Sequence, residues 1–472
     1  MMSNPVLELE KKLFFFATPG LSIAIALLVF GAVAALNGST YIQETLQRQT
    51  QFLEAGNTQL QEWRQSLVMI EHTGKAASPF QARPTSIRLP MVLPPAPLAD
   101  FASGSMELIP TTTTLTAWSN PGSLFAEYEI ANPTVLQIGG FDFTFLAVVI
   151  LPILMIGASF DIVAGDRERG RARLVAAQAG HVGPSVWKRL MMRNLAIWAV
   201  FALIAVIAAL AVSQSAGAER LTHLLVWLSM TAVYAVFWFA MIAFLSAGLK
   251  RSETVAATLF ASWAIFVFAV PAISSAVAEA AYPPPSRLAF LSEMREAEAE
   301  AKLETADLTA GFLADHPELT VSDAAIPAFY QSNFLANQAV TRRVKPLLER
   351  FNQSRRQRSD LIDTFQYLSP ALIINRALSS IAGGDVERGK AFQDQARAAL
   401  EDFTARIGTA VVAKQRISVA DFDNIPDYAY QEQSFADTLA PVILPSLYLI
   451  LASIVLLGVS IRRLKSPLET LL

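Results

Sequence analysis

Residues 221–249, LTHLLVWLSMTAVYAVFWFAMIAFLSAGL, contain no Asp, Glu, Lys or Arg. A helix needs about 20 mostly apolar residues to cross the hydrocarbon core of a membrane. A single buried helix of a soluble protein can share this composition, but five more such stretches lie in the chain. They are residues 13–43, 143–160, 195–218, 254–278 and 438–461. Together the stretches predict an all-α polytopic membrane protein with six transmembrane helices.

The composition of the chain agrees with this class. Of its 472 residues, 53% are hydrophobic and 16% are charged, whereas an ordinary soluble domain has about 25% charged residues. The net charge of −3 does not indicate the excess of basic residues that is typical of nucleic-acid-binding proteins. The absence of cysteine excludes disulfides, thiolate metal sites and thiol nucleophiles.

The first apolar stretch raises the question of a cleaved signal peptide. Lys11 and Lys12 precede it, and Ala32-Val33-Ala34 resembles a signal-peptidase site. A signal peptide has an apolar core of about 7–15 residues, and this stretch is longer. We therefore expect residues 1–43 to form a cytoplasmic N-terminus and a retained first span.

The distribution of Lys and Arg predicts the orientation of the spans, because short cytoplasmic loops are enriched in both. With the N-terminus inside, the cytoplasmic segments hold fourteen basic residues, and the short outer loop between the third and fourth spans holds only Arg220. We expect a multi-pass protein of the bacterial cytoplasmic (inner) membrane with both termini cytoplasmic. Residues 161–194 and 462–472 then lie inside, and residues 44–142 and 279–437 lie outside.

The first outer segment begins with a helical pattern that continues the first span. Gln49 and Gly56 interrupt its heptad spacing, and Gly56-Asn57 can end a helix, so the segment is one long stalk or a hairpin of two helices. Repeated prolines then favour an extended region over residues 79–140 that contains one or two strands, one of them near 109–118. The heptad positions are Ile42, Leu46, Leu53, Leu60, Trp63, Leu67 and Ile70.

The second outer segment reads as helical. Ser369-Pro370 is a helix start, Gly383 is a helix stop, and Asp385 can cap the next helix. Residues 347–365 form a further helix that carries Arg355, Arg356 and Arg358. These arginines are either a solvated face paired with neighbouring acids or a site for an anionic ligand or lipid headgroup. We therefore expect a mostly helical extracytoplasmic domain with a small extended or β portion.

Few residues suggest chemistry. Residues 384–391 resemble a phosphate-binding loop, but Ala391 replaces the hydroxyl residue that holds magnesium, and a helix is expected before the loop. The histidines lack metal-ligand spacing. We therefore predict no catalytic, metal or cofactor site, and expect the chain not to be an enzyme by itself. The spans carry prolines that can kink helices or widen a cavity: Pro19, Pro152, Pro271, Pro441 and Pro445.

The loop after the second span is the most distinctive cytoplasmic feature. Its segment DIVAGDRERGRARL, residues 161–174, places alternating charges on a short helix at the membrane base. Such a helix can dock a soluble partner, or it can anchor the protein to lipid headgroups as the positive-inside rule allows.

Several short motifs in this order resemble the ABC-2 type transporter permeases. They are Phe141-Asp142-Phe143, Leu151-Pro152, Asp166-Arg167-Glu168-Arg169-Gly170 and Asn132-Pro133 ahead of Gly139-Gly140. Leu368-Ser369-Pro370-Ala371 and Ala382-Gly383-Gly384-Asp385 are similar to the subfamily that has a large extracytoplasmic domain of unknown function between the last two spans.

The resemblance implies a permease subunit of an ATP-driven transporter, with an exporter expected. Its partners would be separate ABC ATPase subunits, which bind ATP and Mg, a second permease chain of the same or a sister kind, and membrane lipids. The alternative is a non-transporting mechanotransmitter that drives a periplasmic partner through its outer domain. Arg171-Ala172 departs from the Thr-Leu usual in the family. The resemblance places ATPase coupling on Asp166, Arg167, Glu168, Arg169, Gly170, Arg171 and Arg173.

Overall fold

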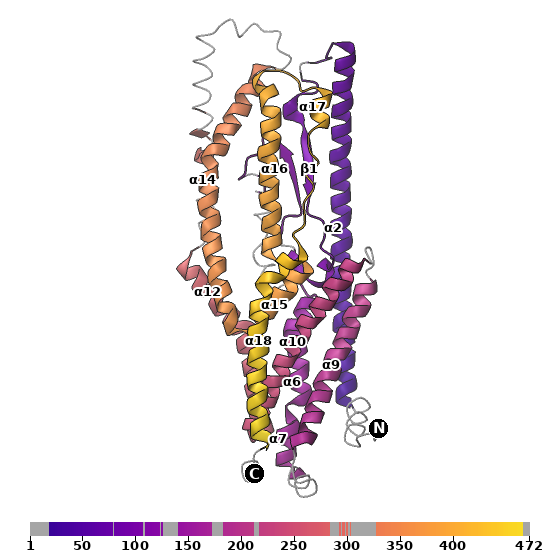
Figure 1. Cartoon of the computed structure of the whole chain (residues 1–472), viewed down its shortest axis with the longest axis vertical. Coiled ribbons are helices and arrows are strands. Elements are labelled where there is room, and N and C mark those ends of the chain that lie inside the picture. The colour runs from indigo at the N-terminus through magenta and orange to yellow at the C-terminus, as the bar shows by residue number, and fades with distance from the viewer. Residues whose placement is uncertain are drawn as a thin grey trace.

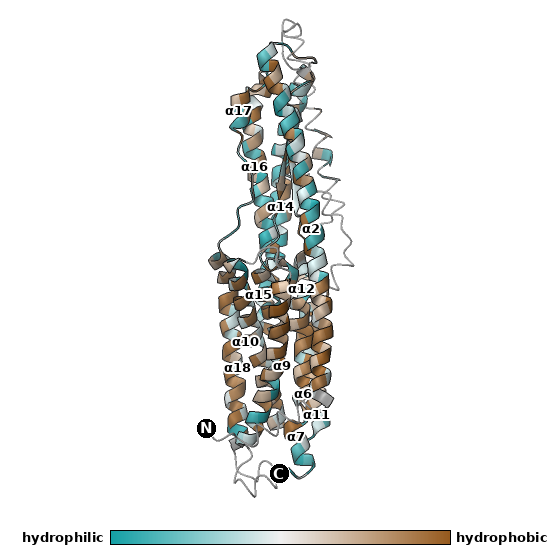
Figure 2. Ribbon diagram, turned by 90° about the vertical axis from the view of Figure 1, so that its right-hand side faces the viewer, coloured by the Kyte–Doolittle hydropathy of each residue, from teal (hydrophilic) through white to brown (hydrophobic). Residues whose placement is uncertain are grey.

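The described part of the chain is an elongated, mostly helical molecule. The computed structural model describes residues 18–78, 80–106, 109–122, 124–125, 140–171, 183–211, 217–283 and 327–465, together with 292, 293, 295–297, 299, 300 and 303. One end is a bundle of apolar helices, and the other is a taller and more polar domain (Figures 1 and 2). We call the latter the outer domain, after the side of the membrane that the sequence predicts for it.

Within these residues, six helices are long and apolar enough to cross a membrane, so the chain is a multi-pass membrane protein. The second span runs on to Glu168, eight residues beyond the apolar stretch that predicts it. The helices that supply the spans are α2 (Thr18–Thr73), α5 (Phe143–Phe145), η4 (Leu146–Ile150), α6 (Leu151–Ser159), α7 (Asp161–Glu168), α9 (Gly183–Ala211), α10 (Ala218–Gly248), α11 (Ser252–Ala264), η5 (Ile265–Ala269), α12 (Val270–Ala281) and α18 (Phe435–Lys465).

Two of the spans contain a π-helical segment directly before a proline. Pro152 follows η4 and Pro271 follows η5 as the second residue of the next helix. Proline donates no backbone hydrogen bond, so carbonyls in the preceding turn need other donors. The Tyr234 hydroxyl donates to the Val148 carbonyl at 3.0 Å, and the Ser369 hydroxyl donates to the Phe266 carbonyl at 2.5 Å. Neighbouring side chains therefore stabilise both irregular turns.

The stalk is one continuous helix. Helix α2 passes through Gly56 without a break, which excludes the hairpin of two helices. Both interruptions of the heptad pattern are contact points: the buried Gln49 amide donates to the Leu93 carbonyl at 2.7 Å, and a Cβ on Gly56 would lie 2.6 Å from the Pro90 ring. The stalk therefore packs against the extended region that follows it.

The extended region forms the small β portion. Strand β1 (Arg88–Val92) pairs antiparallel with β2 (Thr112–Thr116), and Leu89 lies opposite Leu115. One face packs into a core with Trp63 of α2 and Phe403 of α16 (Val386–Val412). Short helical turns interrupt the region, although its prolines predict an extended chain: η1 (Pro84–Ser86), η2 (Ala99–Phe101) and α3 (Ser103–Met106).

The other regular elements described in the outer domain are helices, as the sequence predicts. The Ser369 side chain caps α15 at the Leu372 amide, Asp385 caps α16 at the Arg388 amide, and Gly383 ends α15 with a left-handed backbone at φ 79°. The elements are α14 (Ala328–Phe365), η7 (Gln366–Leu368), α15 (Pro370–Ala382), α16 (Val386–Val412) and α17 (Val419–Asp423).

The outer domain is joined to the membrane bundle by buried polar contacts. Arg220 does not stand in a free loop: it lies in the first turn of α10, is buried, and forms a two-bond ion pair with Asp100 at 2.9 and 3.1 Å. The Arg220 guanidinium also donates to the carbonyls of Ala209 and Pro97. Burial raises the pKa of Asp100, although the hydrogen bonds from Arg220 oppose this shift.

Candidate functional site: the turn after the second span

Helix α7 contains the charged segment on which the resemblance places ATPase coupling. It continues the direction of α6 after a turn at Phe160, and its first half is buried from Ile162 to Gly165 against α9 and α11. Gly170, in a left-handed conformation at φ 71°, follows its last turn. Apart from the partly exposed Asp161 at its start, α7 therefore carries its charges on its last turn and the residues after it.

Asp166 connects α7 to the third span. One carboxylate oxygen lies 2.5 Å from a guanidinium nitrogen of Arg189 on α9, and the other lies 3.7 Å from Arg171. A further contact joins the same two spans: Arg193 of α9 donates to the Ala158 carbonyl of α6 at 2.7 Å. The second and third spans are thus tied together at this end of the bundle.

Arg167 connects α7 to the fourth span. Its half-buried guanidinium donates to backbone carbonyls at the end of α10, with distances of 2.9 Å to Leu249, 3.3 Å to Ser246 and 3.5 Å to Ala247. The last carbonyls of a helix have no partners within the helix and carry partial negative charge. The Arg167 guanidinium therefore supplies hydrogen-bond donors to these carbonyls and a positive charge to this helix end.

Glu168 connects α7 to the fifth span. Its two carboxylate oxygens accept hydrogen bonds from the backbone amide and the hydroxyl of Ser252 at 2.8 and 2.9 Å. Ser252 is the first residue of α11, where amides are unpaired and the helix dipole favours a negative charge. The side chain of Glu168 is exposed, yet both of its oxygens are used inside the chain.

The remaining predicted residues form an exposed tip. Arg169 lies 3.9 Å from Asp161, and both Arg169 and Arg171 have side chains more than half exposed. Arg173 belongs to residues 172–182, which lie outside the described part. The structure thus divides the predicted set into three residues that bind neighbouring helices and a tip that faces outward.

The sequence pattern does not predict the partners of this turn. In the sequence, Arg189 is one basic residue among seven in the cytoplasmic loop, and Ser252 belongs to no motif. A local signal for Ser252 exists, since Ser252-Glu253 directly follows the basic pair Lys250-Arg251 at the start of an apolar stretch. Nothing local pairs it with Glu168, which is 84 residues away.

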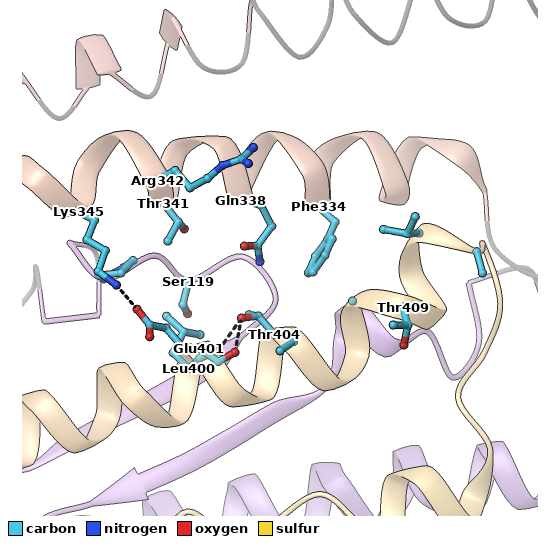
Figure 3. Close-up of a pocket in the computed structure, with 15 residues that line it drawn as sticks. Ser119, Phe334, Gln338, Thr341, Arg342, Lys345, Leu400, Glu401, Thr404 and Thr409 are labelled. Atoms are coloured by element: carbon cyan, nitrogen blue, oxygen red, sulfur yellow. Dashed lines mark hydrogen bonds and ion pairs between the residues drawn. The ribbon is translucent and has the colours of Figure 1, made fainter.

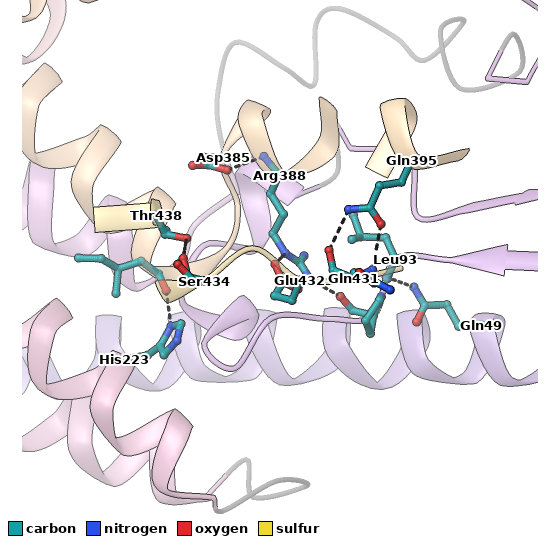
Figure 4. A network of polar contacts seen from close by, with 12 residues as sticks. Gln49, Leu93, His223, Asp385, Arg388, Gln395, Gln431, Glu432, Ser434 and Thr438 are labelled. Atoms are coloured by element: carbon teal, nitrogen blue, oxygen red, sulfur yellow. Dashed lines mark hydrogen bonds and ion pairs between the residues drawn. The ribbon is translucent and has the colours of Figure 1, made fainter. Parts of the chain in front are cut away.

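A pocket of about 560 Å³ lies where the outer domain meets the bundle. Pro441 of α18 lines it, together with His223, whose Nδ1 lies 2.9 Å from the Ile381 carbonyl (Figure 4). Nearby, the buried Arg388 forms a two-bond ion pair with Glu432 at 2.7 and 2.8 Å. Of the other prolines, Pro445 lies inside α18 and Pro19 is the second residue of α2.

A second pocket of about 780 Å³ lies high in the outer domain, between α14 and α16 (Figure 3). Phe334 and Gln338 point into it from α14, and Thr404 and Gly408 line it from α16. An ion pair between Lys345 and Glu401 at 2.9 Å closes one end. The pocket is lined mainly by apolar and small side chains, which suits contact with an apolar group.

The segment that resembles a phosphate-binding loop lies at the junction of two helices. Helix α15 precedes it, as expected, and most of the segment lies in α16. Lys390 pairs with Glu387 at 3.2 Å, one turn away on the same helix. Across the described ranges, no three His, Asp or Glu side chains come together as candidate metal ligands.

One domain family matches the chain. It is described as "Domain of unknown function (DUF3526)" and matches residues 287–431, which contain α14, α15, α16 and α17. No curated protein and no solved structure is significantly similar to the chain. The match lies within the second outer segment and does not include the charged turn. It therefore describes the domain and gives no information about the function of the turn.

Proposed function

We propose that this chain is the membrane-spanning permease subunit of an ATP-driven ABC-2 type transporter, with an exporter favoured. Separate ATPase subunits would dock on the turn after the second span. Two permease chains, identical or sister, would form the path, and ATP and Mg would bind the ATPase subunits. The observation that carries the proposal is the connection of this one turn to three other spans.

The geometry supports transmission of force from the turn. A partner that pushes on the tip at Arg169 and Arg171 would act through Asp166 on α9, through Arg167 on α10 and through Glu168 on α11. A loop that served only to place positive charge near headgroups would not need such contacts to helix ends. The arrangement therefore favours docking over simple anchoring.

The proposed orientation of the chain in the membrane is based on the end of the bundle that contains α7. The ends of α2 and α18 nearest the chain termini lie at the level of α7 (Figure 1). Lys250, Arg251, Arg462 and Arg463 lie in the same region, and such enrichment marks the cytoplasmic side. We therefore place the turn in the cytoplasm and the tall domain outside the bacterial inner membrane.

Cysteine labelling tests this orientation, because the native chain has no cysteine. A membrane-impermeant maleimide should label Arg342→Cys in intact cells and Lys250→Cys only after permeabilisation. Both side chains are exposed, whereas a cysteine at Gly384 would collide with Ser105. The reverse pattern would contradict the proposed topology.

Cross-linking tests the docking itself. Arg171→Cys, bearing a short photoactivated cross-linker, should capture a subunit that hydrolyses ATP, and the chain should stimulate or couple that hydrolysis. Arg342→Cys in the outer domain is the matched control and should capture no such subunit. Capture from Arg342→Cys alone, or no ATPase captured from the tip, would overturn the proposal.

A mechanotransmitter is the second candidate, and the stalk favours it. Helix α2 has 56 residues, so it extends about 84 Å without a break from the bundle to the far end of the outer domain. A rigid rod of this kind can carry movement to a periplasmic partner, which could use the pocket between α14 and α16. Transport of no solute, together with ATP-dependent movement of α14, would favour this function.

A further inference from the structure

Helix α14 carries three arginines in its lower part. Arg355 and Arg356 are exposed, and Arg358 is half-buried. The sequence leaves two interpretations open for them, a solvated face paired with acids or an anion site. We call these three residues the α14 arginine cluster.

The cluster lacks the partners that the first interpretation requires. In the part of the chain that the structure describes, none of its three arginines forms an ion pair. The one contact is that of Arg355, whose guanidinium lies 6.0 Å from the centre of the Phe351 ring. Asp363, a nearby acid on the same helix, pairs instead with Arg376 of α15. Among the described residues, the cluster therefore carries positive charge that no ion pair within 4 Å neutralises, even though the exposed Asp360 lies one turn from Arg356.

The position of the cluster relative to the membrane follows from one aromatic contact. Directly below α14, the Tyr367 ring packs edge-on against Tyr448 of α18, with centroids 5.4 Å apart. Asp437, the last charged residue before the apolar stretch of α18, lies eleven positions before Tyr448, about 17 Å higher. Arg356 lies eleven positions before Tyr367 and hence at nearly the same height.

The chain around the cluster has the profile of an interfacial segment. Charged and polar residues 352–360 stand at the level where α18 enters the apolar layer. Five of the eight residues 361–368 below them are apolar or tyrosine, and the one charged residue among these eight, Asp363, is paired with Arg376. Leu368, at the base, is 59% exposed, as a lipid-facing side chain would be. Figure 2 shows the change from polar to apolar helices at this height.

From these observations we infer that the α14 arginine cluster binds the phosphates of anionic lipid headgroups in the membrane leaflet next to the outer domain. Arginine is suited to this ligand, because its planar guanidinium donates paired hydrogen bonds to phosphate oxygens. Binding would fix the base of α14 at the membrane surface. This inference depends on the spans alone and not on the proposed transport function.

Native mass spectrometry of the full chain in detergent, titrated with phosphatidylglycerol or phosphatidylcholine, tests the inference. The wild-type chain should prefer phosphatidylglycerol. The variant Arg355→Gln/Arg356→Gln should lose about 30-fold in affinity for it, from roughly 1 kcal/mol for each arginine near an anionic surface. Arg355→Lys/Arg356→Lys should keep most of the affinity, because the charge remains.

The chain offers a matched control on the same helix. Arg342→Gln/Arg343→Gln makes the same charge change about 20 Å higher and should leave lipid binding unchanged. Equal loss in the two Gln variants would overturn the inference, as would equal binding of both lipids by the wild-type chain. Displacement of phosphatidylglycerol by millimolar inorganic phosphate would instead show a site for free anions and would also overturn it.

Discussion

Arg167 and Glu168 are neighbours in the chain, and they bind opposite sides of one turn. Arg167 donates to carbonyls at the end of α10, and Glu168 accepts from Ser252 at the start of α11. Positive charge thus meets the negative end of one helix dipole, and negative charge meets the positive end of the next. Any displacement of the end of α7 must therefore move the turn between α10 and α11.

We expect Glu168→Arg to loosen this turn within the chain itself. The substitution removes both acceptors of Ser252 and places a positive charge at the start of α11, where amides already carry partial positive charge. Hydrogen exchange at the Ser252 amide should become faster. Arg171→Glu, at the exposed tip, should leave that exchange unchanged while lowering co-purification of the ATPase subunit. Unchanged exchange in Glu168→Arg would show that the cap is not formed in solution.

Gly56→Ala should destabilise the outer domain. In an exposed helix the change would stabilise by about 1 kcal/mol, but here the new methyl group would lie 2.6 Å from the Pro90 ring. Overpacking of this kind costs about 1–3 kcal/mol, so the net effect is a lower melting temperature. Gly458→Ala is the control, since nothing lies within 4 Å of its Cβ position. Adding Pro90→Ala to Gly56→Ala should recover part of the loss, and the absence of recovery would contradict the packing argument.

Arg220→Met should strongly destabilise the joint between the bundle and the outer domain. The substitution leaves the buried Asp100 without its ion-pair partner, which typically costs about 3–5 kcal/mol. The double variant Arg220→Met/Asp100→Leu removes both charges and should cost less. Thermal unfolding of the full chain in one detergent compares the variants. A double variant less stable than Arg220→Met would argue against an uncompensated charge as the cause.

Stability should rise as the pH falls from about 6 to about 4, with Asp142 as one source. Its buried carboxylate accepts from the Gly104 and Phe145 amides at 3.0 and 2.8 Å, and burial raises its pKa to about 6. Because this pKa exceeds the value of 3.8 in the unfolded chain, Asp142 binds its proton more tightly in the folded chain than in the unfolded one. Protonation between these two pKa values therefore stabilises the fold. The contribution is roughly 3 kcal/mol over this range.

Asp142→Asn isolates this contribution, because burial also raises the pKa values of Asp100 and Asp385. We expect a flatter dependence of the melting temperature on pH in the variant than in the wild-type chain between pH 4 and 6. Infrared spectroscopy should also lose a protonated carboxyl band that appears near pH 6. An identical pH dependence in both chains would contradict the assignment to Asp142.

Features that depend on consecutive residues can be predicted from the sequence alone. Six apolar stretches predict six spans, because a helix in lipid satisfies its backbone internally and needs only length and apolar composition. Ser369 and Asp385 predict two helix starts, since each caps an amide three residues away. The strand near 109–118 and the stop at Gly383 are local in the same sense, and the structure confirms them.

Contacts between residues that are far apart in the chain can be seen only in the tertiary structure. The sequence leaves the stalk open between one helix and two, and the contact of Gly56 with Pro90 accompanies a single helix. From the sequence, Glu168 is predicted to be a free surface charge, but in the structure it accepts hydrogen bonds from Ser252 of α11. Arg220 is predicted to lie in a loop, but it pairs with Asp100, which is 120 positions away in the chain. Local patterns specify which residues become helical, but a charged side chain takes its partner from whichever helix end or buried carboxylate the packing brings within reach.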